Sequence, residues 1–285
     1  MMGKSKVEKG KLFICPTPIG NLKDITLRVL ETLKEVDLIA AEDTRETRKL
    51  LTHFGIKVPI TSYHEHNEAT KGKELLDKLL GGEKIALVSD AGMPGLADPG
   101  HRLIKACIEK GIEVEVLPGP SAFVTALVAS GLPTDSFVYQ GFLPRKKRER
   151  IKLLKELVLE KRTLIFYETP HRLEAALGDV LAVLGVRKMA LARELTKKFE
   201  EIVRGNSSEV LEVVKSKKPK GEMVLIVEGA KAAKKEFLDE AYLRKQIVSL
   251  INKGLTKKEA LKKIAEEEEV PKRMLYELVK EVRRK

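Results

Sequence analysis

Four short loops carry the residues of this chain that are best suited to hold a small ligand. Each loop is rich in Pro, Gly and small polar residues and follows a short apolar run; they span residues 16–21, 90–100, 118–122 and 169–172. Small residues leave backbone N–H and C=O groups open to a ligand. Ligands of open α/β sheets bind beyond the carboxyl ends of the strands, so these loops predict a cleft at that edge. A rigid turn is the alternative for any one loop alone.

The apolar runs before these loops alternate with amphipathic segments. Strands are predicted at 12–15, 38–41, 60–62, 84–88 and 113–117. Helices between them predict an N-terminal α/β domain, residues 1–131, around a mostly parallel sheet. After a break at Gly131 and Pro133, the strand and helix patterns resume, which predicts a second α/β domain over residues 132–230.

Residues 231–285 lack any strand pattern and predict three helices, at 237–252, 257–267 and 272–284. Gly254 ends the first helix, Thr256 and Glu259 form a capping box for the second, and Pro271 starts the third. This segment holds sixteen basic and ten acidic residues, a net charge of +6. A basic helical tail of this kind is compatible with a helix-turn-helix module, and a packing appendage or dimer contact is the alternative.

The net charge of the 285-residue chain is +12, which favours a polyanionic partner such as nucleic acid. The two cysteines, Cys15 and Cys107, lie in strand-like and helix-like runs and fit the core of a protein in a reducing cytoplasm. No Cys/His cluster has metal-ligand spacing, and His64 and His66 alone are a weak signal. No run reaches membrane-spanning length, so neither a metal nor a membrane is expected.

The common nucleotide-binding signatures are missing. The sequence has no GxxxxGK[ST] phosphate loop and no GxGxxG after a strand. The sequence therefore contains neither of the two common signatures, Walker or Rossmann, that would indicate a nucleotide cofactor.

A set of short stretches carries a resemblance to a known family. They begin at Thr17, Ala41, Ser89, Pro118, Gly141, Pro170, Arg193 and Lys220, and read TPIGNL, AEDTR, SDAGMPGLADPG, PGPSA, GFLP, PHR, RELTK and KGE. Together they resemble the tetrapyrrole methylase superfamily, and within it the members that methylate the ribose 2′-oxygen of a cytidine in the 16S rRNA decoding centre. One departure is Ala97, where these proteins often have Ser, so a catalytic hydroxyl is not expected there.

The resemblance implies two α/β domains with S-adenosyl-L-methionine bound in the cleft between them, 16S rRNA in the 30S subunit as substrate, and a homodimer. The implied cofactor contacts lie at strand ends or in the following loops: Pro18, Gly92, Gly95, Ser121, Ala122, Tyr167, Glu194 and Met223. Ser121 is also placed to cap the helix that follows it. The tetrapyrrole C-methyltransferases of the superfamily and a non-catalytic RNA-binding protein of the same fold are the alternatives.

A ribose hydroxyl is a poor nucleophile, so a base or a fixed acceptor should assist methyl transfer. The candidate acceptors are Asp43, Asp90 and Glu65, with Asn21 and Arg45 to orient them, and each also fits a structural role. Phosphate contacts are expected from the basic run after the second domain begins: Arg145, Lys146, Lys147, Arg148 and Arg150. A solvated basic face is the alternative for this run.

Overall fold

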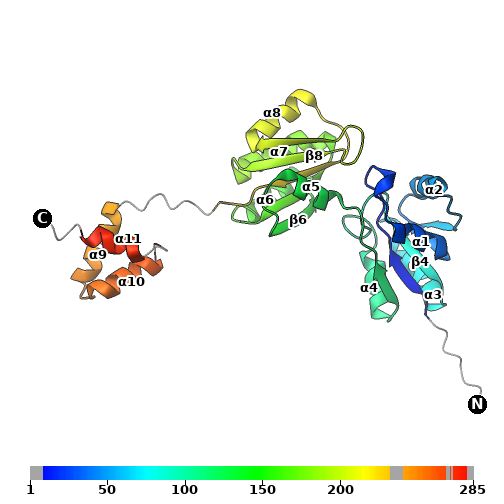
Figure 1. Ribbon diagram of the computed structural model, residues 1–285, viewed down its shortest axis with the longest axis horizontal. Coiled ribbons are helices and arrows are strands. Elements are labelled where there is room, and N and C mark those ends of the chain that lie inside the picture. The colour runs from blue at the N-terminus through cyan, green and yellow to red at the C-terminus, as the bar shows by residue number, and fades with distance from the viewer. Residues whose placement is uncertain (1–8, 232–239, 268–269, 271, 281–285) are drawn as a thin grey trace, which may run out of the picture. The chain divides into compact units, whose positions relative to one another are not determined.

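The computed structural model describes residues 9–231, 240–267, 270 and 272–280 (Figure 1). The chain divides into two compact units, Met1–Gly229 and Ala230–Lys285. The first unit contains two five-stranded sheets and the second contains helices. We describe each unit by itself.

The first sheet has the strand order β3-β2-β4-β1-β5, and all its strand pairs are parallel. Its strands are β1 (Lys11–Ile14), β2 (Leu38–Ala41), β3 (Ile60–Ser62), β4 (Lys84–Val88) and β5 (Glu113–Val116). Its helices are α1 (Leu27–Glu35), α2 (Thr44–His53), α3 (Glu68–Leu80) and α4 (His101–Glu109), with a 3-10 helix, η1 (Leu22–Asp24). The predicted parallel sheet is confirmed. We call this part the first lobe.

Both faces of the first sheet are covered, because successive strand residues point to opposite sides. In β4, Ile85 and Leu87 pack into one core cluster, whereas Ala86 and Val88 pack into the other. The two cysteines, Cys15 and Cys107, are buried and free. This double coverage explains why β4 is a continuous apolar run that ends at a polar loop.

The second sheet is mixed, with the order β6-β7-β10-β8-β9. β6 runs parallel to β7, while β10 is antiparallel to β7 and β8, and β8 is antiparallel to β9. Its strands are β6 (Phe137–Phe142), β7 (Thr163–Glu168), β8 (Lys188–Arg193), β9 (Glu201–Asn206) and β10 (Met223–Val227). Three helices, α6 (Lys147–Glu156), α7 (Pro170–Leu184) and α8 (Ser207–Lys217), follow its strands. Helices α6, α7 and α8 contribute to the main core cluster on one face of this sheet.

Helix α5 (Ala122–Ser130) covers the other face of the second sheet. Its Ala126 and Leu127 are buried with Ile165 of β7 and Ala190 of β8. The sequence expectation places this helix in the first domain, but α5 packs on β7, β8, β9 and β10. We therefore call the second sheet with α5–α8 the second lobe. A domain boundary at residue 131 stays a prediction, because both lobes belong to one compact unit, Met1–Gly229.

The second unit is a small helical bundle of α9 (Glu240–Asn252), α10 (Lys257–Glu267) and α11 (Lys272–Lys280). Its core consists of leucine and isoleucine side chains from all three helices: Leu243, Ile247, Leu261, Ile264, Leu275 and Leu278. The predicted capping box is present, since the Glu259 amide donates to Thr256 Oγ1 (3.3 Å) and the Thr256 amide donates to Glu259 Oε2 (2.9 Å). The predicted positions 237–239, Pro271 and 281–284 lie outside the described residues. Across the described part of the chain, no helix is long and apolar enough to cross a membrane.

The separate cores generate a first prediction. Ending the chain after Gly229 should leave the α/β unit folded, with a melting temperature within a few degrees of that of the full chain. The reason is that the core clusters of both lobes draw every buried residue from the first unit. Calorimetry of both proteins checks this, and a truncated chain that no longer melts cooperatively would contradict it.

Candidate functional site

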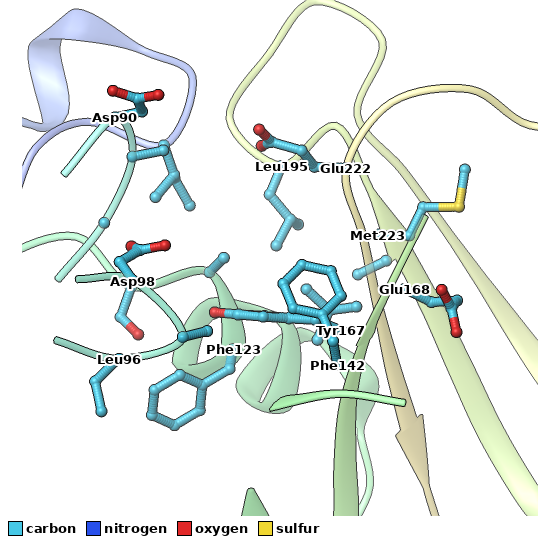
Figure 2. Close-up of a pocket in the computed structure, with 18 of the residues that line it drawn as sticks. Asp90, Leu96, Asp98, Phe123, Phe142, Tyr167, Glu168, Leu195, Glu222 and Met223 are labelled. Carbon is cyan, nitrogen blue, oxygen red and sulfur yellow. The ribbon is translucent and has the colours of Figure 1, made fainter. Parts of the chain in front are cut away.

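A cavity of about 310 Å³ lies between the loops at the carboxyl ends of the first sheet and the loops that follow β7 and β8 and precede β10 in the second sheet (Figure 2). The first lobe lines it with Ile19, Glu42, Asp90, Ala91, Gly92, Met93, Leu96, Ala97 and Asp98. The second lobe lines it with Ser121, Ala122, Phe123, Phe142, Tyr167, Glu168, Thr169, Pro170, Ala192, Leu195, Gly221, Glu222, Met223 and Val224. Each of the four predicted loops contributes at least one residue. The size and the mixed lining are typical of a small-molecule site.

The loop after β4 is held against the loop after β1 by a two-residue bridge. The Thr17 and Gly92 amides each donate to the other residue's carbonyl at 2.9 Å. The Thr17 hydroxyl donates to the Ser89 carbonyl, also at 2.9 Å. Gly92 has a φ of +83°, which disfavours any residue with a side chain. Glycine is therefore required for the bridge, and the bridge fixes one wall of the cavity.

Acidic side chains from different elements converge in this cavity. Glu42 follows β2, Asp90 and Asp98 belong to the loop after β4, and Glu222 precedes β10. Figure 2 shows Asp90 and Asp98 on one side and Glu222 across from them. Burial, together with the nearby carboxylates of Glu42 and Asp90, raises the pKa of Asp98 to about 7. A cation would relieve this repulsion, so the cavity is suited to a positively charged ligand.

Glu42 and Asp90 are shifted in the same direction. Burial raises the pKa of Glu42, and the neighbouring Asp90 raises it further. Asp90 is an exposed residue, but partial loss of water around its carboxyl raises its pKa, although the Asp43 amide donates to Asp90 Oδ1 at 3.0 Å and opposes the shift. Carboxyls with raised pKa values hold and release protons nearer neutral pH than exposed ones do. The first-lobe side of the cavity is therefore suited to proton transfer.

The opposite wall is aromatic and aliphatic. The rings of Phe142 and Tyr167 have centroids 5.4 Å apart, and Met223 lies beside them in Figure 2. Burial raises the pKa of Tyr167 well above its ordinary value, so its phenol stays neutral at physiological pH. Ala122 and Phe123 in the first turn of α5 complete this part of the lining. Such a wall can pack against the flat ring or alkyl chain of a ligand.

The structure brings five of the eight predicted cofactor contacts to the cavity: Gly92, Ser121, Ala122, Tyr167 and Met223. Pro18 and Gly95 belong to loops that reach the cavity but do not line it. Glu194 stands behind the wall, where its Oε1 accepts from the Glu222 amide at 3.2 Å. Ser121 occupies the N-cap position of α5 as expected, but its side chain makes no capping hydrogen bond with the helix.

Of the predicted acceptor and orienting residues, Asp90 lines the cavity and the others do not. The Asp43 carboxylate caps α2 and accepts three hydrogen bonds from Arg45. The Arg45 amide (2.8 Å) and Nε (3.1 Å) donate to Oδ1, and Arg45 Nη2 donates to Oδ2 (2.6 Å). The Arg45 hydrogen bonds hold the pKa of the Asp43 carboxyl far below its ordinary value, which makes it a poor base. Asn21 caps η1, since its Oδ1 accepts from the Lys23 amide at 3.1 Å. Glu65 is exposed in the loop after β3.

The predicted phosphate contacts separate into two groups. Residues 145–148 are exposed at the start of α6, and Lys146 and Lys147 form only long ion pairs, with Glu149 (3.4 Å) and Asp179 (3.9 Å). The expectation that Arg150 contacts phosphate is wrong. Arg150 is buried, and its Nη2 pairs with Asp179 at 2.6 Å because a buried guanidinium needs a partner.

Several lining residues were missed by sequence reasoning, most importantly Glu42, Asp98 and Glu222. Glu42 directly follows β2, and Asp98 lies in the loop that was singled out. For these two residues the sequence held a usable signal, because each is a carboxylate in a loop that follows a strand. His64 and His66 have ring centroids 6.0 Å apart, and no cluster in the described part of the chain is arranged to hold a metal ion.

Comparison with known proteins identifies the class. Residues 11–211 match the family of tetrapyrrole (corrin/porphyrin) methylases. Two solved structures share this fold: uroporphyrin-III-C-methyltransferase from Thermus thermophilus (21% identity, 77% of this chain and 94% of that one, TM-score 0.55) and the methyltransferase CobJ (22%, 78% and 95%, TM-score 0.59). At these identities the likeness shows the fold.

Curated relatives define the family more narrowly. Each of them is named ribosomal RNA small subunit methyltransferase I. The relative from Halalkalibacterium halodurans is 50% identical, and the match covers 95% of each chain. The relative from Synechocystis sp. is also 50% identical, and the match covers 94% of this chain and 97% of the relative. The relative from Thermotoga maritima is 49% identical, and the match covers 77% of this chain and 99% of the relative. The chain therefore belongs to the tetrapyrrole methylase family and, within it, to the ribosomal RNA small subunit methyltransferase I family. The resemblance inferred from the motifs is confirmed.

The half-buried Asp98 carboxyl generates a second prediction. Its folded-state pKa of about 7 lies above the ordinary value of 3.8, so its contribution to stability falls as pH rises between these values. Asp98→Asn removes this loss. The variant should gain on the order of 2 kcal/mol relative to the wild type between pH 5 and pH 8. Urea unfolding at both pH values measures it. Asp77→Asn, an exposed change on α3, is the control, and equal curves for Asp98→Asn and wild type would contradict the prediction.

Proposed function

We propose that this protein is an S-adenosyl-L-methionine-dependent methyltransferase that methylates the ribose 2′-hydroxyl of a cytidine in 16S rRNA of the small ribosomal subunit. The observation that carries the proposal is the cavity between the strand-end loops of the two lobes, in a chain of this family. The relatives' name supplies the substrate class. The ribose position and the nucleotide rest on the motif resemblance.

The lining of the cavity fits the cofactor. The methionine part of S-adenosyl-L-methionine carries a sulfonium and an ammonium cation, and the acidic group of Glu42, Asp90, Asp98 and Glu222 provides compensating negative charge. Gly92 and Ala122 add little side-chain bulk to the wall, and the aromatic wall can pack against the adenosine. When bound there, the cofactor supplies an electrophilic methyl group.

Among the predicted candidates, Asp90 is the best placed to accept the proton of the attacking hydroxyl. It lines the cavity, its residue is exposed, and its pKa is raised, whereas the Asp43 carboxylate is occupied by Arg45. The Asp43 amide holds Asp90 Oδ1 in place at 3.0 Å, so the carboxylate is positioned before the substrate arrives. Proton acceptance by a positioned carboxylate contributes typically about 10²–10⁴-fold to such reactions.

The substrate is assigned to RNA because of the charge outside the cavity. The exposed run of residues 145–148 begins three residues after Phe142, which lines the cavity. A 2′-hydroxyl exists only in RNA, and its recognition usually requires an unstacked nucleotide. A tetrapyrrole substrate would not need this basic run, and the tetrapyrrole-modifying neighbours support the fold alone. The intact loops at the cavity argue against a non-catalytic RNA-binding protein.

We extend the proposal to the 30S subunit as the substrate particle, to the cytoplasm as location, and to a homodimer. The first two follow from the proposed rRNA substrate. The homodimer rests on the superfamily resemblance, and exposed apolar side chains on α5, Val124 and Val128, are compatible with it. The basic helical unit, residues 230–285, is proposed to help dock the ribosomal substrate.

A third prediction tests the reaction itself. Purified protein with labelled S-adenosyl-L-methionine should transfer a methyl group to 30S subunits or to 16S rRNA that lack the modification. Nucleoside mass spectrometry should then find 2′-O-methylcytidine, because the proposed nucleophile is the ribose oxygen. N4- or C5-methylcytidine with an unmodified ribose would refute the assignment.

A fourth prediction separates the two aspartates. Asp90→Asn should lower kcat by about 10²-fold or more, because it removes the proposed proton acceptor while keeping its shape. Asp43→Asn should lower kcat less than tenfold, because an asparagine oxygen can still cap α2. Single-turnover rates and cofactor calorimetry measure both. Equal losses in the two variants, or unchanged turnover in Asp90→Asn, would remove Asp90 from this role.

A further inference from the structure

The exposed face of α2 forms a second hollow, which is basic and open to solvent. It is lined by Arg45, Arg48, Lys49, Thr52 and His53. These positions are three or four residues apart, so they share one face of the helix. The opposite face, with Thr47, Leu50 and Leu51, is buried against the first lobe. We call this surface the α2 basic face; it has three cations and a hydroxyl on one rigid element.

The cations of the α2 basic face are available to an external anion. Among the described residues, none forms a hydrogen bond or ion pair with the Arg48 side chain. Lys49 pairs with Glu46 at 2.7 Å, but both side chains are more than half exposed, at 71% and 52%. Exposed pairs of this kind contribute at most about 1 kcal/mol and exchange readily. Arg45 is bound to Asp43 yet keeps 81% of its side chain exposed.

The α2 basic face begins at the rim of the cavity. β2 and β4 pair in register up to Ala41 and Val88. Glu42, one residue further, and Asp90, two residues further, line the cavity. Asp43 joins the two features, because its amide donates to Asp90 while its side chain caps α2. A ten-residue helix is about 15 Å long. The basic side chains therefore extend outward from the acidic interior.

This arrangement separates charges by sign. The interior holds Glu42, Asp90 and Asp98, which repel phosphate groups. The rim of the first lobe carries the α2 basic face, and the rim of the second lobe carries residues 145–148. One sugar of a polyanionic chain can therefore enter the cavity only if the phosphates on either side of it are held outside, away from these carboxylates.

We propose that the α2 basic face binds backbone phosphates of the rRNA next to the target nucleotide, as a second phosphate-binding rim on the first lobe. The inference rests on the proposed function and deepens it. Arg48 and Lys49 contact the phosphates directly, and Thr52 can donate a hydrogen bond to the same groups. The two rims then hold the strand on both sides of the nucleotide that enters the cavity.

The test uses the full-length double variant Arg48→Gln/Lys49→Gln. Its matched control is Lys34→Gln/Lys57→Gln, which removes two exposed lysines just before β2 and β3, at the opposite edge of the first sheet. A 16S rRNA fragment and 30S subunits serve as ligands. Binding is measured across a salt series, together with kcat, KM and cofactor affinity.

The test variant should bind rRNA about tenfold more weakly, and the slope of log K against log salt should fall by about 1–2. KM for RNA should rise, while cofactor affinity and kcat at saturating RNA stay within twofold. The control variant should behave as wild type. A salt slope and KM unchanged from wild type would overturn the proposal. Arg48→Glu, which reverses one exposed charge, provides the same test if the double variant melts early.

Two further outcomes separate this inference from others. If wild-type protein methylates no rRNA, the proposed function fails; if it methylates rRNA and the α2 variants match it, only this inference fails. Titration with inorganic phosphate distinguishes a small-anion site. Loss of phosphate binding in the variant without any loss of rRNA affinity would overturn the proposal in favour of a free anion ligand.

Discussion

The site depends on one buried seam between the two lobes. Ile19, from the loop after β1, packs in the same cluster as Leu195 and Ala126 of the second lobe. The Thr17–Gly92 bridge fixes the neighbouring backbone at the same place. A hydrogen bond from the Asn21 amide to Thr196 Oγ1 (3.0 Å) joins the two lobes at the same seam. The apolar contact and this hydrogen bond together hold the loops of the two lobes around the cavity.

Around that seam the protein separates opposite charges over a short distance. Carboxyl groups line the cavity, where partial loss of water and mutual repulsion raise the pKa of Glu42, Asp90 and Asp98. Cations lie outside, where water reduces the cost of keeping them charged. The inside suits a cationic methyl donor, and the outside suits a polyanion, so one site can accept both without their charges competing for the same groups.

The interior carboxyls also cost stability. Keeping Asp98 half-buried near other acids opposes folding once it ionises, and Ala97 beside it has a φ of +67°, which is unfavourable for a residue with a side chain. A protein selected for stability alone would not retain both features in one loop. Both features lie in a loop that lines the cavity, and backbone strain and perturbed carboxyl groups commonly cluster at functional sites.

The sequence by itself determined the local structure: periodicity and capping signals predicted most strands and helices and the loops that reach the cavity, because these depend on neighbouring residues. The tertiary structure alone decided which of several similar residues faces the site. Arg148 is exposed whereas Arg150 is paired with Asp179, and Asp90 lines the cavity whereas Asp43 binds Arg45. It also placed α5 on the second sheet and Glu42 beside Asp90. Such choices depend on partners far along the chain, which local patterns do not encode.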